Sequence, residues 1–103
     1  MSSTVVPCLR YRDAPRMIEW LCSNLGFEKR LVVPGKDKDV GHAELTLGDG
    51  MVMIGAEADD DYGQLLTTPQ KTGGLQTQTI WIRVDDADLV YSRVVESGAD
   101  IVR

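Results

Sequence analysis

The stretch Leu9-Arg10-Tyr11-Arg12-Asp13-Ala14 decides the fold class, because it recurs as Ile82-Arg83-Val84-Asp85-Asp86-Ala87. Each copy has an aspartate directly before its final alanine, and aspartate is suited to cap a helix. Each copy is also followed by an apolar helical pattern that ends in a glycine, Gly26 or Gly98. An internal repeat normally buries its apolar face against its sister. The sequence therefore predicts two related units that share one sheet.

Around the first copy, the pattern predicts one strand, one helix and three further strands. Alternation favours a strand over residues 5–12, and Asp13 favours a helix that begins directly after it and ends at Gly26. Further strands are expected over residues 27–33, 40–47 and 51–56. The last two are joined by Gly48-Asp49-Gly50, which is typical of a hairpin.

The second copy predicts a shorter unit. A strand over residues 78–84 is followed by a helix capped by Asp85 or Asp86, with Leu89, Val90 and Val94 facing inward, and residues 100–103 begin another strand. No counterpart of residues 40–56 follows, so the second unit is expected to be cut short. The predicted fold is α+β, with tandem βαβββ modules that form a curved mixed sheet. The expected divisions are a first module at 1–57, a linker at 58–77, and an incomplete βαβ module at 78–103.

Strand alternation sorts the side chains onto two faces. A uniformly apolar face is expected beneath the two helices, and it includes Leu45, Leu47, Ile80, Ile82 and Val84. The other face mixes sulfur-bearing, aromatic and polar side chains: Val6, Cys8, Arg10, His42, Glu44, Thr46, Met51, Met53, Thr79, Trp81 and Arg83. This mixture is typical of a small-molecule cavity.

Composition and charge exclude several function classes. The 103 residues carry a net charge of −5 with no basic cluster, which argues against a nucleic-acid partner. The sequence begins without a signal-peptide pattern and has no apolar run of the roughly 20 residues that span a bilayer. Cys8 and Cys22 are the only cysteines and lack metal-ligand spacing. The sequence therefore predicts a reduced, cytoplasmic protein without nucleic-acid or membrane partners.

The chain resembles the glyoxalase/bleomycin-resistance/dioxygenase superfamily, also called the vicinal oxygen chelate superfamily. The most telling motif is Gly41-His42-Ala43-Glu44-Leu45-Thr46-Leu47-Gly48-Asp49-Gly50, which resembles the pattern of small bacterial members. Further matching stretches, which together span most of the chain, are residues 9–13, 24–27, 81–86 and 97–101. The resemblance implies two βαβββ modules whose curved sheet surrounds a ligand cavity.

Metal-dependent members of this superfamily hold a divalent ion with one residue from each of four strands. The resemblance places Val6, Glu44 and Thr79 at three of these positions, and the fourth falls beyond the last residue. Valine cannot bind a metal and threonine is a poor ligand for zinc, nickel or iron, so no metal cofactor is expected. His42 and Glu44 share one strand face, which leaves a metal or acid–base pair open beside the interpretation of a hydrogen-bonded pair at the cavity.

The sequence assigns candidate ligand-binding residues but no catalytic residue. The candidates are Cys8, Arg10, His42, Glu44, Met53, Trp81 and Arg83. Cys8 as a nucleophile would need a nearby base and a lowered pKa, so a small sheet residue is the preferred interpretation. Trp81 could stack on a planar ligand or pack at an interface. Arg10 and Arg83 could pair with Glu44 or hold an anionic group.

The preferred function is metal-free sequestration of a small molecule or antibiotic, which the resemblance to the bleomycin-resistance branch implies. The alternative is a metal-dependent lyase, isomerase or dioxygenase that uses Glu44 and His42, so enzyme activity stays undecided. A third interpretation is a fragment with a structural role. The open edge of the incomplete second module further predicts a homodimer, with contacts through Trp20, Trp81 and residues 57–77.

Overall fold

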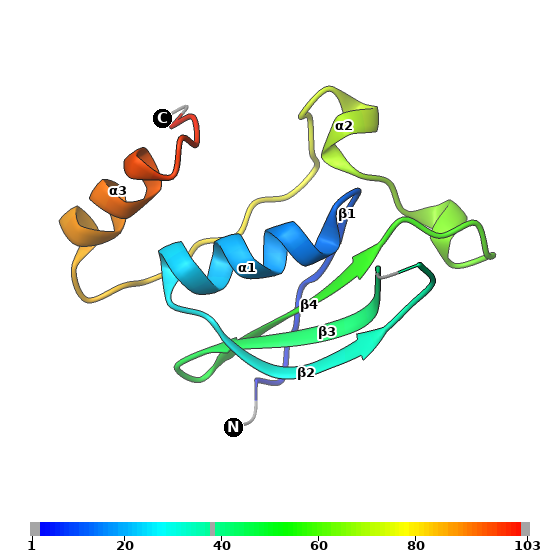
Figure 1. Cartoon of the computed structure of the whole chain (residues 1–103), viewed down its shortest axis with the longest axis horizontal. Coiled ribbons are helices and arrows are strands. Elements are labelled where there is room, and N and C mark those ends of the chain that lie inside the picture. Colours follow the sequence, from blue (N-terminus) through cyan, green and yellow to red (C-terminus); the bar gives the residue numbers. More distant parts are fainter. Residues whose placement is uncertain (1–2, 38, 102–103) are drawn as a thin grey trace.

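The computed structural model describes residues 3–37 and 39–101. Its sheet has four strands in the order β1-β4-β3-β2, with β1 parallel to β4 and the other neighbours antiparallel. Figure 1 shows this open sheet, built from β1 (Cys8–Tyr11), β2 (Glu28–Pro34), β3 (Val40–Leu47) and β4 (Gly50–Ala56). The predicted α+β class and the βαβββ order of the first module are confirmed.

Helix α1 (Ala14–Leu25) lies against one face of this sheet (Figure 1). It begins where the Asp13 carboxylate accepts a hydrogen bond from the backbone N–H of Arg16 at 3.2 Å, as the sequence predicts. It ends at Gly26, whose φ of 84° is a left-handed conformation that glycine adopts without steric cost. Both ends of α1 are therefore set by single local residues.

The hydrophobic core lies between α1 and the sheet. Leu45 and Ile54 are at most 1% exposed, and the burial of Leu45 confirms the predicted apolar face of β3. The buried cluster consists of Ala14, Ile18, Leu21, Phe27, Val40, Ala43, Leu45, Val52, Ile54 and Ala56. Leu47 and Ile82 pack at its margin. Since α1 covers this face, the opposite face of the sheet carries the polar side chains that alternate with the core residues.

Two short helical turns lie within the segment expected to be a linker. They are a 3-10 turn, η1 (Gly63–Leu65), and a short helix, α2 (Pro69–Thr72). Thr68 is 1% exposed, and its hydroxyl donates a hydrogen bond to Glu57 Oε1 at 2.8 Å. A Cβ on Gly63 would lie 2.2 Å from the carbonyl oxygen of Ala58, so only glycine fits there. The loop thus has a defined conformation at the end of β4.

Residues 78–84 do not form the predicted strand, because no second strand is positioned to pair with them within the described residues. Ile82 still packs on the core margin and Val84 is half-buried, but Ile80 is 40% exposed instead of packed beneath a helix. Residues 100 and 101 are likewise not in a strand, and residues 102 and 103 of that predicted strand lie outside the described residues.

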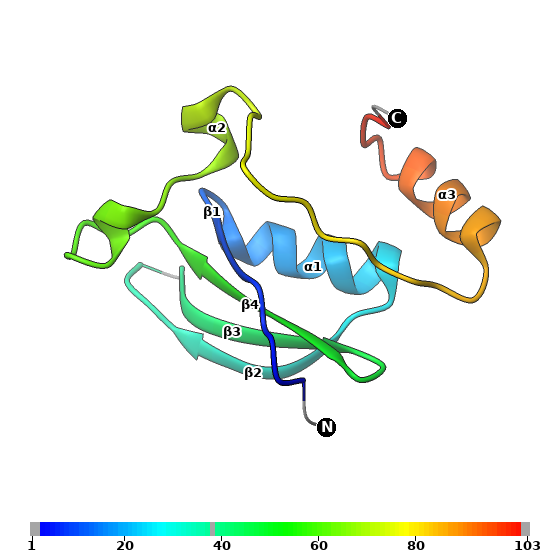
Figure 2. The same cartoon turned by 180° about the vertical axis from the view of Figure 1, so that it is seen from behind.

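Helix α3 (Ala87–Glu96) is capped by Asp86, whose carboxylate accepts from the Leu89 backbone N–H at 3.0 Å. Figures 1 and 2 both show it beyond the C-terminal end of α1, away from the sheet. The apolar side chains of α3 that were expected to face inward are not buried: Leu89 is 47% exposed, and no residue of α3 is buried. Trp20 Nε1 donates to Ser97 Oγ at 3.1 Å and links α1 to the end of α3.

Across the described residues, no helix is sufficiently long and apolar to traverse a membrane.

Candidate ligand-binding site

The open face of the sheet carries a cleft of about 230 Å³. Strands β1, β3 and β4 form its floor, and the loop after β4 adds Tyr62; the lining is Cys8, Leu9, Arg10, Gly41, His42, Met53, Ile54, Gly55 and Tyr62. The strand register places Cys8 opposite Met53 and Arg10 opposite Gly55. Residues paired in this way project from the same face, so the register itself gathers the polar and sulfur-bearing groups.

Arg10 is the central cation of this cleft. Its Nη1 donates to the backbone oxygen of Ala56, and its guanidinium carbon lies 5.4 Å from the centroid of the Tyr62 ring. A Cβ on Gly55 would lie 3.4 Å from Arg10 Nη1, so the glycine leaves room for the guanidinium. Among residues 3–37 and 39–101, no carboxylate forms an ion pair with Arg10. The guanidinium can therefore donate hydrogen bonds to an anionic ligand.

His42 and Glu44 form a polar pair beside the cleft. His42 Nε2 lies 3.0 Å from Glu44 Oε2, and Arg30 pairs with the other carboxylate oxygen. The hydrogen bond with His42 and the Arg30 charge lower the pKa of Glu44. A carboxylate only accepts, so Nε2 carries the proton, and a neutral imidazole then has Nδ1 as an acceptor. The cationic partner of Glu44 is thus Arg30, not Arg10 or Arg83 as the sequence allowed.

Two sulfur atoms meet at the β1 side of the cleft. Cys8 Sγ lies 4.0 Å from Met53 Sδ and 3.7 Å from the backbone oxygen of Val6. The Cys8 side chain is exposed, whereas Met53 is half-buried. The second cysteine, Cys22, lies on α1, where burial raises the pKa of its thiol. Cys8 is therefore the thiol that faces the cleft.

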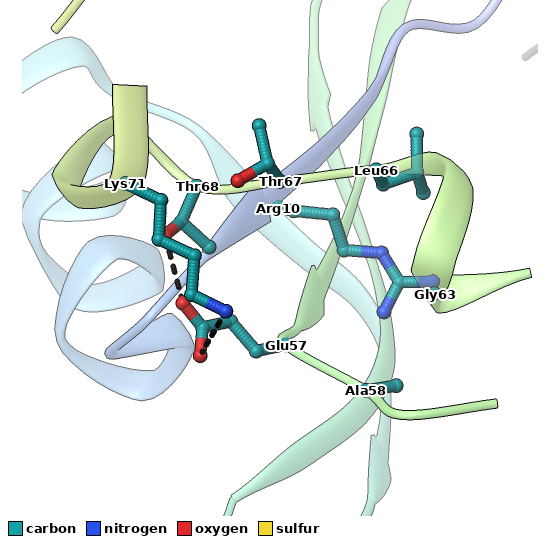
Figure 3. Close-up of a pocket in the computed structure, with 8 residues that line it drawn as sticks. All are labelled: Arg10, Glu57, Ala58, Gly63, Leu66, Thr67, Thr68 and Lys71. Carbon is teal, nitrogen blue, oxygen red and sulfur yellow. Dashed lines mark hydrogen bonds and ion pairs between the residues drawn. The ribbon is translucent and has the colours of Figure 1, made fainter. Parts of the chain in front are cut away.

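A smaller cavity of about 30 Å³ lies under the loop after β4. Figure 3 shows Thr68 and Lys71 converging on Glu57, with the Arg10 guanidinium on the opposite side near Gly63. The hydrogen bond from Thr68 and the Lys71 ammonium at 3.7 Å lower the pKa of Glu57. The cavity is large enough to admit a water molecule. The contacts of Glu57 with Thr68 and Lys71 connect the loop to the end of β4 beside Arg10.

Comparison with known proteins identifies the family. The model of the Glyoxalase/Bleomycin resistance protein/Dioxygenase superfamily matches residues 4–103. The chain belongs to this superfamily. A solved structure, TioX from Micromonospora sp. ML1, is 31% identical with a TM-score of 0.68, covering 98% of this chain and 75% of TioX. The search of curated proteins gives no match. The resemblance predicted from sequence is therefore confirmed.

The residues of this superfamily member do not fit the divalent metal site expected in its metal-dependent relatives. Val6 has no donor atom, and Thr79 lies in the segment that does not join the sheet. In the described part of the chain, no group of three His, Cys, Asp or Glu side chains converges. His42 and Glu44 alone fall short of the three protein ligands of a catalytic zinc site.

The structure brings together part of the predicted site. Cys8, Arg10, His42 and Met53 line one cleft, and Glu44 supports His42 from beside it. Trp81 is 91% exposed, and neither it nor Arg83 lines the cleft, since residues 78–84 do not extend the sheet.

Sequence reasoning missed three contributors. Tyr62 lies in the segment interpreted as a linker. Gly55 matters only through its register with Arg10. Arg30 is the extra residue at a register shift between Lys29 and Leu31, and such a bulge interrupts the alternation that sequence patterns rely on. A polar aromatic within an acidic loop was the only signal available for Tyr62.

Proposed function

We propose that this chain binds a small organic molecule bearing an anionic group, in the cleft on the open face of the sheet, without a divalent metal ion. The observation that carries this proposal is the Arg10 guanidinium, which lacks a carboxylate partner among the described residues and lines a cleft whose lining contains no acidic side chain. Membership of the superfamily supports small-molecule binding in general.

The cleft offers distinct contacts to the two ends of such a ligand. Arg10 would hold the anionic end through charge-assisted hydrogen bonds. Met53 and the Tyr62 ring, which is 55% exposed, would contact a flat apolar body through sulfur and aromatic surfaces. His42, with Nε2 engaged by Glu44, would accept a hydrogen bond from a ligand hydroxyl or amine at Nδ1.

The side chains of the cleft favour sequestration of a ligand over its catalytic conversion. Glu44 is held on both oxygens, by His42 and by Arg30, so it positions the imidazole rather than a substrate atom. One observation favours a second candidate function: a carboxylate that orients an imidazole is also the arrangement of a general base or of a metal-bound histidine. A metal-dependent lyase, isomerase or dioxygenase is therefore the alternative.

Titration calorimetry with matched probes separates these functions. We expect 2-naphthoate to bind at least about tenfold more tightly than the neutral 2-naphthalenemethanol, a difference of about 1.4 kcal/mol. Arg10→Met should remove that preference, whereas Arg16→Met, a change of an exposed arginine on α1, should keep it. Equal binding of both probes would overturn the anionic class. Loss of binding in EDTA with recovery on added zinc would favour the metal-dependent alternative.

A further inference from the structure

We propose that Cys8 and Met53 form a binding site for one soft monovalent cation, copper(I) or silver(I). The two residues are direct partners on the parallel strands β1 and β4. Their side chains project from the same face, and Sγ and Sδ lie 4.0 Å apart. The site therefore has two donor atoms from two strands, held at a fixed register by the sheet.

The sulfur–sulfur distance matches one shared ion. A metal–thiolate bond is about 2.3 Å long. Two bonds of about this length at an angle of about 120° would separate the sulfurs by about 4 Å, which agrees with the 4.0 Å between Sγ and Sδ. A flexible methionine side chain can make the remaining adjustment because it has three rotatable bonds. No movement of the backbone is needed.

The donor types select the cation. Thiolate and thioether are soft ligands that favour copper(I) over hard cations such as magnesium and calcium. On binding, the Cys8 S–H bond breaks, the sulfur lone pair forms the S–metal bond, and the proton goes to solvent, so no oxidant or reductant is required. The thiolate and the monovalent cation together are neutral, which suits a cleft that already contains Arg10.

The third coordination position would face the cleft. Glu44 is the direct partner of Met53, so His42, two residues earlier on β3, is its diagonal neighbour on the same face. Diagonal neighbours in a sheet remain within reach of long side chains. The Nδ1 atom of His42 is the acceptor left by the Glu44 hydrogen bond, and it is the third donor we assign.

Silver(I) and copper(I) binding to the whole chain tests this site. Competition against a chromogenic copper(I) chelator under reducing, anaerobic conditions should give one ion per chain. Cys8→Ser should abolish binding, and Met53→Leu should weaken it at least about tenfold because a donor is lost without a change of charge. Cys22→Ser removes the other thiol and is the matched control, which should bind as the native chain does.

Three outcomes would overturn the site. Unchanged affinity in Met53→Leu would reduce it to a single exposed thiol, and loss of binding in Cys22→Ser would move it to α1. Zinc binding as tight as copper(I) binding would assign the donors to a divalent site. The two proposals share Met53 and His42 but differ at Arg10. Arg10→Gln, which adds no sulfur donor, should retain one bound ion per chain while abolishing the preference for 2-naphthoate, so either idea can fail alone.

Discussion

At the scale of single residues, Glu44 organises the polar part of the open face. Its side chain is 13% exposed and accepts from His42 and Arg30 at once. Both partners favour the ionised carboxylate, which lowers its pKa. The ionised Glu44 therefore holds Nε2 of His42 and leaves Nδ1 free. Protonation of the Glu44 carboxyl would release both His42 and Arg30.

The lowered pKa of Glu44 predicts a loss of stability in acid. Its contribution is fully present above the ordinary value of 4.5 and is lost as the pH falls through the lower folded value. Urea unfolding at about pH 7 and about pH 3 should therefore show a larger fall in midpoint for the native chain than for Glu44→Gln. Glu57, whose pKa is also lowered, titrates in both proteins and supplies the common background. Equal falls in the two proteins would contradict this assignment.

At the scale of elements, local signals predicted α1 and β3 closely. Asp13 and Gly26 set the ends of α1, and the expected strand at residues 40–47 is β3 itself. The expected strand at residues 78–84 failed because a strand needs a partner, and its alternation says nothing about whether one is present. The same limit applies to α3, whose apolar stripe is not buried in the structure.

The candidate site was likewise predicted only in part from the sequence. Alternation placed Cys8, Arg10, His42 and Met53 on one face, and the register brings them into one cleft. The place of Tyr62 in the cleft could not be predicted, because a loop carries no periodicity that indicates where its side chains point. Contacts that depend on regular strands were thus predictable, whereas contacts that depend on a bulge or a loop were not.

The core between α1 and the sheet predicts a clear contrast between two leucines. Leu45 is 0% exposed within the buried cluster, so Leu45→Ala should lower the free energy of unfolding by about 2–5 kcal/mol. Leu65 in η1 is 79% exposed, and Leu65→Ala should change the free energy of unfolding by less than about 0.5 kcal/mol. Chemical denaturation measures both. Similar losses in the two variants would place the core elsewhere.

At the scale of the whole molecule, both edges of the sheet are open in the described structure. Strand β1 pairs only with β4, and β2 pairs only with β3. Unpaired edges invite another chain. Large apolar side chains are exposed between α2 and the end of α3, among them Leu75, Trp81, Leu89, Tyr91 and Val95. We propose that a second copy covers this region in a homodimer.

Sedimentation at micromolar concentration tests this assembly. The native chain should sediment as a dimer, and Trp81→Ser should shift it toward monomer because it removes the most exposed aromatic side chain, 91% accessible in the single chain. Val32→Thr lies in the edge strand β2, away from the proposed contact region. It is the matched control and should leave the dimer intact. A monomeric native chain would refute the proposal, and dissociation caused by Val32→Thr alone would move the contact to β2.

The central claim is that ligands bind on the open face formed by β1, β3 and β4. Amide and methionine-methyl NMR shifts during titration with 2-naphthoate test it most directly, because each signal reports one position. We expect the largest changes at Arg10, Gly41, Gly55 and the methyl group of Met53, with little change along α1. Changes confined to α3 and the segment around Trp81, with the cleft silent, would contradict the account.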